Sequence, residues 1–282
     1  MNGIESTEKF KVGIIGGTGG MGRWFARFFT QEGHPVFVSG RSRGPSLSEM
    51  AGACSVVIVS VPIGVTCEVI RKVGPFMKED SLLMDLTSLK AEPMRAMLES
   101  SVSEVIGLHP LFGPSQPSLA GQNIALCPGR GKNWLPRVRN LLGKKGARMV
   151  ETTPERHDEI MATVQGINHL DTIILGLFLQ EVGLDPAILE RFSTPILRTK
   201  MEIIQKVFSH PALYAEIIAL NPYLRRMIDL YQRTFAEMKI ATEKGNAEDL
   251  KRLIEQRKTG PWASATPAGG SFSVRGTPLA KP

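Results

Sequence analysis

A glycine-rich turn lies between an apolar run and a helical pattern within the first 31 residues of the chain. Residues 11–16 (KVGIIG) have the composition of a buried strand, and residues 21–31 place apolar and aromatic side chains at helical spacing. The turn between them, GTGGMG at 17–22, fits the pattern G-x-G-x-x-G. Small residues there let the backbone turn tightly and bring N–H groups against a diphosphate at a helix N-terminus. The turn predicts a dinucleotide-binding unit, and a glycine turn without a ligand is the alternative.

The remainder of the first 150 residues alternates strand patterns with helical patterns. Further strands are predicted at 35–39, 55–61, 81–86, 105–108, 124–127 and 148–151, and helices near 65–73, 93–98 and 134–142. Strands that alternate with helices favour a mostly parallel sheet with helices on both faces. The sequence therefore predicts a doubly wound, Rossmann-type α/β domain over residues 1–152.

The pattern changes after Thr153, where only helical periodicity remains. The predicted helices cover 160–182, 186–208, 211–220, 222–244 and 247–256. Residues 173–179 are nearly all apolar, so their helix is expected to be buried inside a domain or in a dimer interface. These patterns predict an all-helical domain over residues 153–257. The remaining residues, 258–282, are rich in Gly, Pro, Ser, Thr and Ala, and we expect them to be disordered.

Charge and cysteine usage exclude several classes of protein. The net charge is +7, but the 34 basic residues are spread along the chain, which favours attraction of small anions over binding of nucleic acid. Three scattered cysteines predict neither a disulfide framework nor a metal site, which favours a reducing, cytoplasmic location. No apolar run approaches the roughly 18 residues that span a bilayer, and the N-terminus does not resemble a secretory signal.

The end of the second predicted strand indicates which dinucleotide binds. NAD-binding units usually place an acidic residue there for the ribose 2′-hydroxyl, whereas this chain has Ser39, Arg41, Ser42 and Arg43. Arginine can bind a 2′-phosphate through two hydrogen bonds, so we predict NADP over NAD; solvated loop arginines are the alternative. The residues expected to hold the cofactor are Gly17, Thr18, Gly19, Gly20, Met21, Gly22, Ser39, Arg41, Ser42, Arg43, Val61 and Pro62.

Three polar segments follow predicted strands at the edge of the sheet where doubly wound folds bind ligands, at 60–63, 85–90 and 107–114. His109 ends its strand, and an imidazole can take a hydroxyl proton near neutral pH. Ser88 could hydrogen-bond the same hydroxyl, and Lys90 could hold anionic groups or neighbouring loops. Without further context, a structural histidine is the alternative.

Five runs in this order resemble prephenate dehydrogenases of the tyrosine pathway, most closely the archaeal and enteric-type branch. They are GGTGGMGRWFARFF, VIVSVPIGVT, LLMDLTSLK, GLHPLFGPS and ERHDEIMATVQGINH. Order and spacing hold over residues 11–245. The resemblance implies oxidative decarboxylation of prephenate to 4-hydroxyphenylpyruvate, with hydride passing from C4 to a nicotinamide. It also implies that His109 takes the hydroxyl proton and that Ser88 assists.

The resemblance also assigns substrate-binding residues. His169 falls where the family has a substrate-side histidine, and Arg198 matches an arginine of some members. Lys206 stands where an arginine commonly grips a carboxylate, and it keeps the charge without the two-donor fork. Lys90 and Ser115 complete the expected set.

Lys206 leaves the choice of substrate open. Three interpretations remain: weaker binding, a different substrate, or substitution for the missing arginine by Arg198, Arg225 or Arg226. Arogenate and 4-amino-4-deoxyprephenate are therefore alternative substrates, and a non-catalytic NADP-sensing protein is a further alternative. His157 also recurs in the family, and its position near a helix start favours a structural role. The apolar helix and the resemblance together imply a homodimer through the helical domain, with no nucleic-acid or membrane partner.

Overall fold

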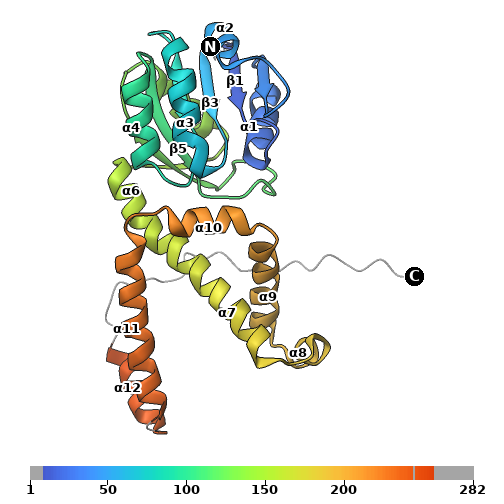
Figure 1. Cartoon of the computed structure of the whole chain (residues 1–282), viewed down its shortest axis with the longest axis vertical. Helices are drawn as coiled ribbons and strands as arrows, with labels where there is room; N and C mark the ends of the chain where they lie inside the picture. The colour runs from blue at the N-terminus through green and yellow to red at the C-terminus, as the bar shows by residue number, and fades with distance from the viewer. Residues whose placement is uncertain (1–8, 244, 257–282) are drawn as a thin grey trace, which may run out of the picture. The chain divides into compact units, whose positions relative to one another are not determined.

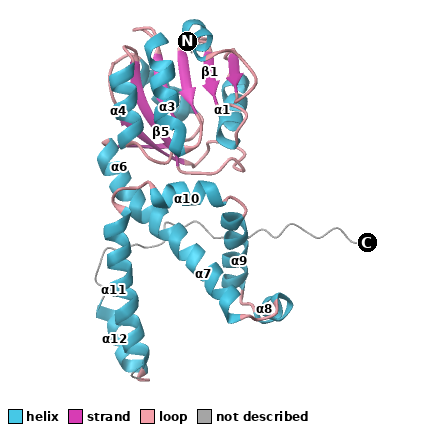
Figure 2. Ribbon diagram, viewed as in Figure 1, coloured by secondary structure: helices cyan, strands magenta, loops and turns pink. Residues whose placement is uncertain are grey.

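Seven strands form one sheet in the computed structural model, which describes residues 9–243 and 245–256 (Figures 1 and 2). The strands are β1 (Val12–Ile15), β2 (Val36–Ser39), β3 (Val56–Val59), β4 (Leu82–Asp85), β5 (Glu104–Pro110), β6 (Asn123–Pro128) and β7 (Arg148–Glu151). The helices among them are α1 (Gly20–Gln31), α2 (Leu47–Ala53), α3 (Ile63–Val73), α4 (Ala91–Ser100) and α5 (Trp134–Lys144), with a short 3-10 helix, η1 (Gly74–Phe76).

The strand order is β2-β1-β3-β4-β5-β6-β7, and all neighbouring strands are parallel except β5 and β6. The predicted doubly wound, mostly parallel sheet is thus confirmed. The chain leaves β1 toward β2 on one side and reaches β3 on the other, so the fold has its switch point between β1 and β3. Open α/β sheets bind ligands at such a switch point, beyond the carboxyl ends of the strands.

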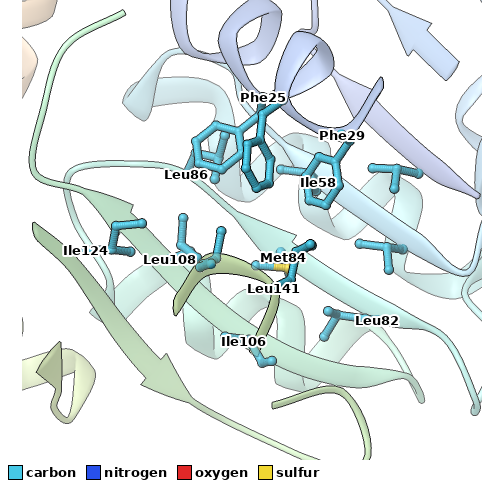
Figure 3. Packing of buried hydrophobic residues seen from close by; sticks show 14 of the residues in the cluster. Phe25, Phe29, Ile58, Leu82, Met84, Leu86, Ile106, Leu108, Ile124 and Leu141 are labelled. Atoms are coloured by element: carbon cyan, nitrogen blue, oxygen red, sulfur yellow. The ribbon is translucent and has the colours of Figure 1, made fainter. Parts of the chain in front are cut away.

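Alternate residues of the strands face two separate cores. The first face carries Ile14, Ile58, Met84 and Leu108 against aromatic residues of α1 and apolar residues of α5 (Figure 3). The second face carries the intervening residues, such as Val57 and Leu83, against α2, α3 and α4. Both faces are apolar, which explains why the strands read as continuous apolar runs rather than as alternating patterns.

One short helix was absent from the sequence prediction. α2 begins after Ser46, whose side chain accepts from the Glu49 backbone N–H while the Glu49 carboxylate accepts from the Ser46 N–H. This reciprocal capping box stabilises the first turn of a helix that is too short to show apolar periodicity. The S-x-x-E spacing was the available signal.

Only helices follow β7 in the described residues, in agreement with the predicted helical region. They are α6 (Pro154–Met161), the π-helical turn η2 (Ala162–Ile167), α7 (Asn168–Val182), α8 (Pro186–Phe192), α9 (Pro195–Phe208), α10 (Pro211–Ala219), α11 (Leu224–Glu243) and α12 (Ala247–Gln256). The chain divides into two compact units, Met1–Met227 and Ile228–Pro282. The predicted disordered tail, 258–282, lies outside the described residues.

The prediction of a single helix over 186–208 was wrong. Two helices occupy this range, and the break falls at Ser193 and Thr194. Pro195 lacks an N–H and cannot continue a preceding helix, whereas it suits the first turn of a new one. Thr194 caps that turn by accepting from the Leu197 N–H at 3.3 Å.

The continuous helical run Pro154–Val182 is the one segment of the described chain long and apolar enough to cross a membrane, by length and composition alone. Several apolar side chains in its second half are exposed in this single chain: Ile174, Leu177 and Phe178 are 46%, 49% and 56% exposed. Within residues 173–179, Gly176 is buried, because it packs closely against α9. Of the two predicted environments for this helix, burial inside the domain therefore does not apply to these side chains.

Candidate active site

The glycine turn is built so tightly that side chains would not fit in it. Gly16 has φ +79°, and a Cβ there would lie 2.2 Å from the Ser60 carbonyl oxygen of the loop after β3. A Cβ on Gly22 would lie 2.4 Å from the Gly16 carbonyl oxygen. Gly19 is the N-cap of α1, and the first turn of that helix has no acidic residue. The N–H groups of Gly16, Gly17 and Gly19 donate to backbone carbonyls, whereas those of the first turn of α1 have no acceptor within the helix. The start of α1 therefore offers N–H groups and a positive helix end at the switch point, which fits a diphosphate.

The loop after β2 packs against this turn. A hydrogen bond from Gly40 N–H to the Arg43 carbonyl oxygen (2.8 Å) closes the loop. A Cβ on Gly40 would lie 2.8 Å from the Thr18 hydroxyl oxygen, so the loop and the glycine turn are in direct contact. Arg41, Ser42 and Arg43 are exposed, so their side chains are available at the edge of the turn.

The loop after β5 also reaches the glycine turn. The Trp24 indole of α1 donates to the Gln116 carbonyl oxygen at 2.6 Å, and a Cβ on Gly20 would lie 3.1 Å from Pro114. The segment that follows His109 therefore lies over the start of α1. Ser115 in this loop is exposed. Val61 lies on the opposite side of the turn, 2.9 Å from where a Gly16 Cβ would stand, and Pro62 is exposed.

His109 lies at the carboxyl end of β5 and is only 2% exposed. Its Nδ1 is 2.9 Å from Nε2 of His157, and the His157 Nδ1 is 2.8 Å from a carboxylate oxygen of Asp158. On its other side, His109 Nε2 is 3.2 Å from the amide nitrogen of Gln165. All three partners come from the helical run after β7, so His109 joins the sheet to that run through polar contacts rather than through apolar packing.

The partners of His109 are held in place by the helix geometry. Asp158 accepts hydrogen bonds from the backbone N–H groups of Lys90 (2.8 Å) and Ala91 (2.9 Å), where α4 begins. Gln165 lies in the π-helical turn η2, and such turns are rare and frequent at functional sites. The contacts fix α6 and η2 against the strand ends that carry His109.

Burial controls the protonation of His109. Removal from water, followed by the neighbouring His157 and Lys90, lowers the pKa of His109 well below its usual range. A lowered pKa keeps the imidazole neutral at physiological pH, which is the form that can accept a proton.

Lys90 lies in the interior of the domain. It is fully buried, its ammonium pairs with the carboxylate of Asp85, and it donates to the Leu108 carbonyl oxygen at 3.2 Å. Thr87 also donates to Asp85 through its backbone N–H at 3.0 Å. Of the two roles that the sequence allowed, Lys90 thus holds the neighbouring strand end in this structure, next to His109. Ser88, two residues before it, is half-buried.

Two of the predicted substrate-binding residues lie close together. The His169 ring packs edge-on against Tyr214 with centroids 4.7 Å apart, and burial and then the charge of Lys206 lower the pKa of His169. The Lys206 ammonium lies 3.9 Å from where a Cβ of Gly113 would stand, in the loop that follows His109. Arg198, two turns before Lys206 in α9, is exposed. The structure thus brings His169, Lys206 and the His109 loop together.

Several residues of this site have little signal in the sequence. Gly16 lies one residue before the pattern at 17–22, and its positive φ was not visible from composition. His157 was assigned a structural role, and Asp158, Gln165 and Asp85 were not singled out. The E-R-H-D spacing put a histidine next to an acid, but only the fold shows that this pair faces His109.

The doubly wound sheet and the glycine turn at its switch point define a dinucleotide-binding α/β protein with a helical region after the sheet. Two sequence models match the chain: "Prephenate dehydrogenase, nucleotide-binding domain" over residues 33–151 and "Prephenate dehydrogenase, dimerization domain" over residues 153–256. Because these matches cover most of the chain, it belongs to the prephenate dehydrogenase family, as the resemblance of its motifs indicated.

Individual relatives agree with this assignment. A Methanocaldococcus jannaschii protein named "Probable arogenate/prephenate dehydrogenase" is 36% identical over 87% of this chain and 59% of its own length. The "T-protein" of Haemophilus influenzae is 35% identical over 82% of this chain and 62% of its own length. The chain thus spans about three fifths of the length of these curated relatives.

A solved structure shares the fold. Prephenate dehydrogenase from A. aeolicus, in complex with hydroxyphenyl propionate and NAD+, superimposes with a TM-score of 0.71. The match covers 90% of this chain and 98% of that one at 19% sequence identity, so it shows the fold alone.

Proposed function

We propose that this chain is a nicotinamide-dependent dehydrogenase that converts prephenate to 4-hydroxyphenylpyruvate. One observation carries the proposal: a buried histidine with a lowered pKa ends β5, and its loop covers the start of the glycine turn. That arrangement supports a proton acceptor next to a dinucleotide.

In the proposed reaction, Nε2 of His109 accepts a proton from the substrate and later returns it. The substrate hydroxyl replaces the Gln165 amide as the partner of Nε2, and the imidazole accepts the C4 hydroxyl proton there. The O–H electron pair becomes part of the new C4 carbonyl, and the C4 hydrogen leaves as hydride. A bound nicotinamide supplies the hydride acceptor. The bond from the ring to its carboxylate then breaks, CO2 leaves, and the electron pair makes the ring aromatic. His109 returns its proton to the phenolate oxygen, so the proton count balances.

The glycine turn supports binding of the cofactor diphosphate, because Gly16, Gly17 and Gly22 leave no room for side chains around its backbone N–H groups. We propose that Arg41 and Arg43, carried by the loop that packs on Thr18, bind the 2′-phosphate of NADP. No acidic side chain lies in the loop 39–44 to repel that phosphate.

Substrate binding is proposed for the residues around the His109 loop. His169 and Lys206 supply donors for the substrate carboxylates, with Ser88 near the reacting hydroxyl and Ser115 in the covering loop. Arg198 lies on the same helix as Lys206 and is proposed as the second cation. Lys90 supports the site indirectly, because its ammonium pairs with Asp85 and donates to the Leu108 carbonyl oxygen, next to His109.

The proposed domain division follows the chemistry: residues 1–152 bind the dinucleotide, and residues 153–257 bind substrate and form a homodimer. The exposed apolar side chains of α7 support dimerisation, as does the description of the second matching family model. We place such an enzyme, with its free buried cysteines, in the cytoplasm.

A substrate panel tests the proposal. Prephenate, arogenate and 4-amino-4-deoxyprephenate are each offered with NAD+ and with NADP+, and the gain in absorbance at 340 nm gives kcat/KM. We expect prephenate with NADP+ to give the highest value. The name of the M. jannaschii relative makes arogenate the nearest alternative. Cofactor binding by fluorescence without turnover of any of the three would instead indicate a non-catalytic NADP sensor.

A further inference from the structure

Three buried side chains form a continuous hydrogen-bonded series that ends at a carboxylate. His109, His157 and Asp158 are 2%, 1% and 2% exposed, and the two links between them measure 2.9 and 2.8 Å. At the end of the series opposite to Asp158, His109 also contacts Gln165 of the π-helical turn η2. Groups so thoroughly buried have fixed partners, so the direction of each hydrogen bond can be worked out from one end to the other.

The direction is set by the two ends of the series. The Asp158 carboxylate can only accept, so the proton between it and His157 lies on Nδ1 of His157. In neutral His157, Nε2 then accepts, and the donor is Nδ1–H of His109. At the other end, the amide nitrogen of Gln165 can only donate, so it requires an acceptor at Nε2 of His109. Both ends therefore place the proton of neutral His109 on Nδ1 and the lone pair on Nε2.

We propose that His157 and Asp158 are positioning residues that hold His109 in the tautomer whose Nε2 can accept a proton. The inference rests on the proposed function only for the consequence to catalysis, because the tautomer itself is a property of the free protein. When Nε2 takes a proton, His109 becomes an imidazolium whose Nδ1–H already donates to His157, backed by Asp158. An imidazole released from this series could carry its proton on Nε2 and would then be unable to act as the base.

Asp158 also has a structural role, and the test must distinguish its effect on folding from its effect on the tautomer of His109. Its two oxygens accept from Lys90 N–H and Ala91 N–H at the start of α4, and its backbone carbonyl accepts from Asn221 at 2.9 Å. Loss of Asp158 would therefore disturb folding as well as the tautomer. Among the described residues, the His157 side chain makes no hydrogen bond beyond those to His109 and Asp158, so it is the better position to change.

Nitrogen-15 NMR on histidine-labelled protein tests the tautomer without substrate or cofactor. Spectra are taken at about pH 8, above the ordinary histidine pKa, and the His109 signals are assigned by their loss in His109→Asn. In the unaltered protein we expect an unprotonated Nε2 and a protonated Nδ1 on His109. In His157→Leu the proton should move at least partly to Nε2. A protonated Nε2 in the unaltered protein, or no change in His157→Leu, would overturn the proposal.

Kinetics of two His157 variants test the consequence. His157→Leu should lower kcat about 100-fold, with KM and cofactor affinity changed less than threefold, a size typical of partners that orient an active group. His157→Gln can still accept from His109 and donate to Asp158, so it should recover kcat to within about tenfold of the unaltered enzyme. Equal losses in both variants would contradict the proposal, because a merely structural role does not distinguish them.

Controls keep the two proposals separable. Glu159→Gln alters the surface neighbour of Asp158, which pairs with Arg156, and should leave kcat and the NMR spectrum unchanged. Urea unfolding of each variant identifies any loss of structure. If the unaltered chain oxidises none of the three cyclohexadiene substrates, the proposed function fails, yet the NMR experiment still decides whether His157 sets the tautomer of His109.

Discussion

Glu216 of α10 accepts a hydrogen bond from the backbone N–H of Ile63, the first residue of α3, at 2.9 Å. The N-cap of α3 is Pro62, which has no side-chain acceptor. The Glu216 carboxylate, 153 residues further along the chain from Ile63, therefore acts as the acceptor at this helix N-terminus. α3 starts directly after β3, at the switch point where the glycine turn lies. The contact therefore ties α10 to the nucleotide-binding region at its ligand edge.

Removal of this carboxylate should destabilise the protein. Glu216→Ala leaves the Ile63 N–H without its acceptor and takes a negative charge from a helix N-terminus, so the free energy of unfolding should fall by about 1–2 kcal/mol. Glu216→Gln keeps an acceptor and should lose less than half of that. Urea unfolding measures both, with Glu68→Ala, an exposed residue of α3, as the control. Equal losses in all three variants would remove the special role of Glu216.

His109→Asn should abolish most of the turnover. Asparagine has no group that accepts a proton near neutral pH, so kcat should fall by a factor of about 10²–10⁴. The glycine turn is untouched, and the dissociation constant of the cofactor should change less than threefold. Stopped or continuous assays at 340 nm give kcat, and quenching of tryptophan fluorescence gives the cofactor affinity. Near-normal turnover would exclude His109 as the base.

Arg41→Ala should weaken NADP far more than NAD. A guanidinium on a 2′-phosphate makes charge-assisted hydrogen bonds, and their loss should raise the Kd of NADP by about tenfold or more. NAD lacks that phosphate, so its Kd should stay nearly constant. Arg27→Ala, on an exposed part of α1, is the matched control because it makes the same change of charge. If the Kd values of NADP and NAD rise equally, Arg41 contributes only to the overall electrostatic field of the protein.

The buried pair of Lys90 and Asp85 should be strongly coupled in stability. Lys90→Met leaves the fully buried Asp85 without its cation and should reduce the free energy of unfolding by about 3–5 kcal/mol. The double variant Lys90→Met, Asp85→Leu removes both charges and should recover at least half of this loss. Urea unfolding of the two single variants and the double variant forms a mutant cycle. Additive losses would mean that the two charges do not stabilise one another in the fold.

Stability should rise with pH in the mildly acidic range. His109 has a lowered pKa in the folded state, so below pH 6.5 the unfolded chain binds a proton that the folded chain does not. The stabilisation is complete above pH 6.5, the ordinary histidine value, and is lost progressively as the pH falls from there toward the lower pKa of the folded state. His157 and Lys90 face His109, with Asp158 and Asp85 behind them, and none is altered in His109→Asn. That variant should therefore show a smaller slope of unfolding free energy against pH between 5 and 6.5, and an unchanged slope would contradict the assignment.

The order of strands and helices could be predicted because both faces of the sheet are covered. Runs such as 55–61 are apolar at every position, and the helices between them keep their own period. The sequence does not indicate that β6 pairs antiparallel with β5, because the apolar pattern of a buried strand is the same for both directions of pairing. Pro195 indicates a break between two helices. The apolar periodicity that continues on each side instead favoured a single helix over 186–208.

Some residues of the site could likewise be predicted from the local sequence, whereas others depend on the fold. His109, the glycine turn and the arginine loop are local patterns, each legible within a few residues of a strand end. The partners of His109 are 48 and 56 residues away in sequence, and their approach depends on how the helical run lies against the sheet. Lys90 illustrates the converse, because the sequence allowed it to hold either anionic groups or neighbouring loops, and only the fold shows that it pairs with Asp85 in the interior.

The π-helical turn Ala162–Ile167 accommodates an extra residue within the helical run, because its hydrogen bonds join residues five apart rather than four apart. Deletion of one residue within this turn would restore ordinary α-helix and leave the later side chains, His169 and the exposed apolar side chains of α7 among them, aimed much as they are now. The same deletion in the α-helix beyond the turn would instead rotate every later side chain by about 100° about the helix axis. What a deletion in the turn would change is the turn itself, which carries Gln165, the donor to His109. A single codon lost there would thus preserve the ligand-facing and subunit-facing surfaces while altering the immediate surroundings of the base.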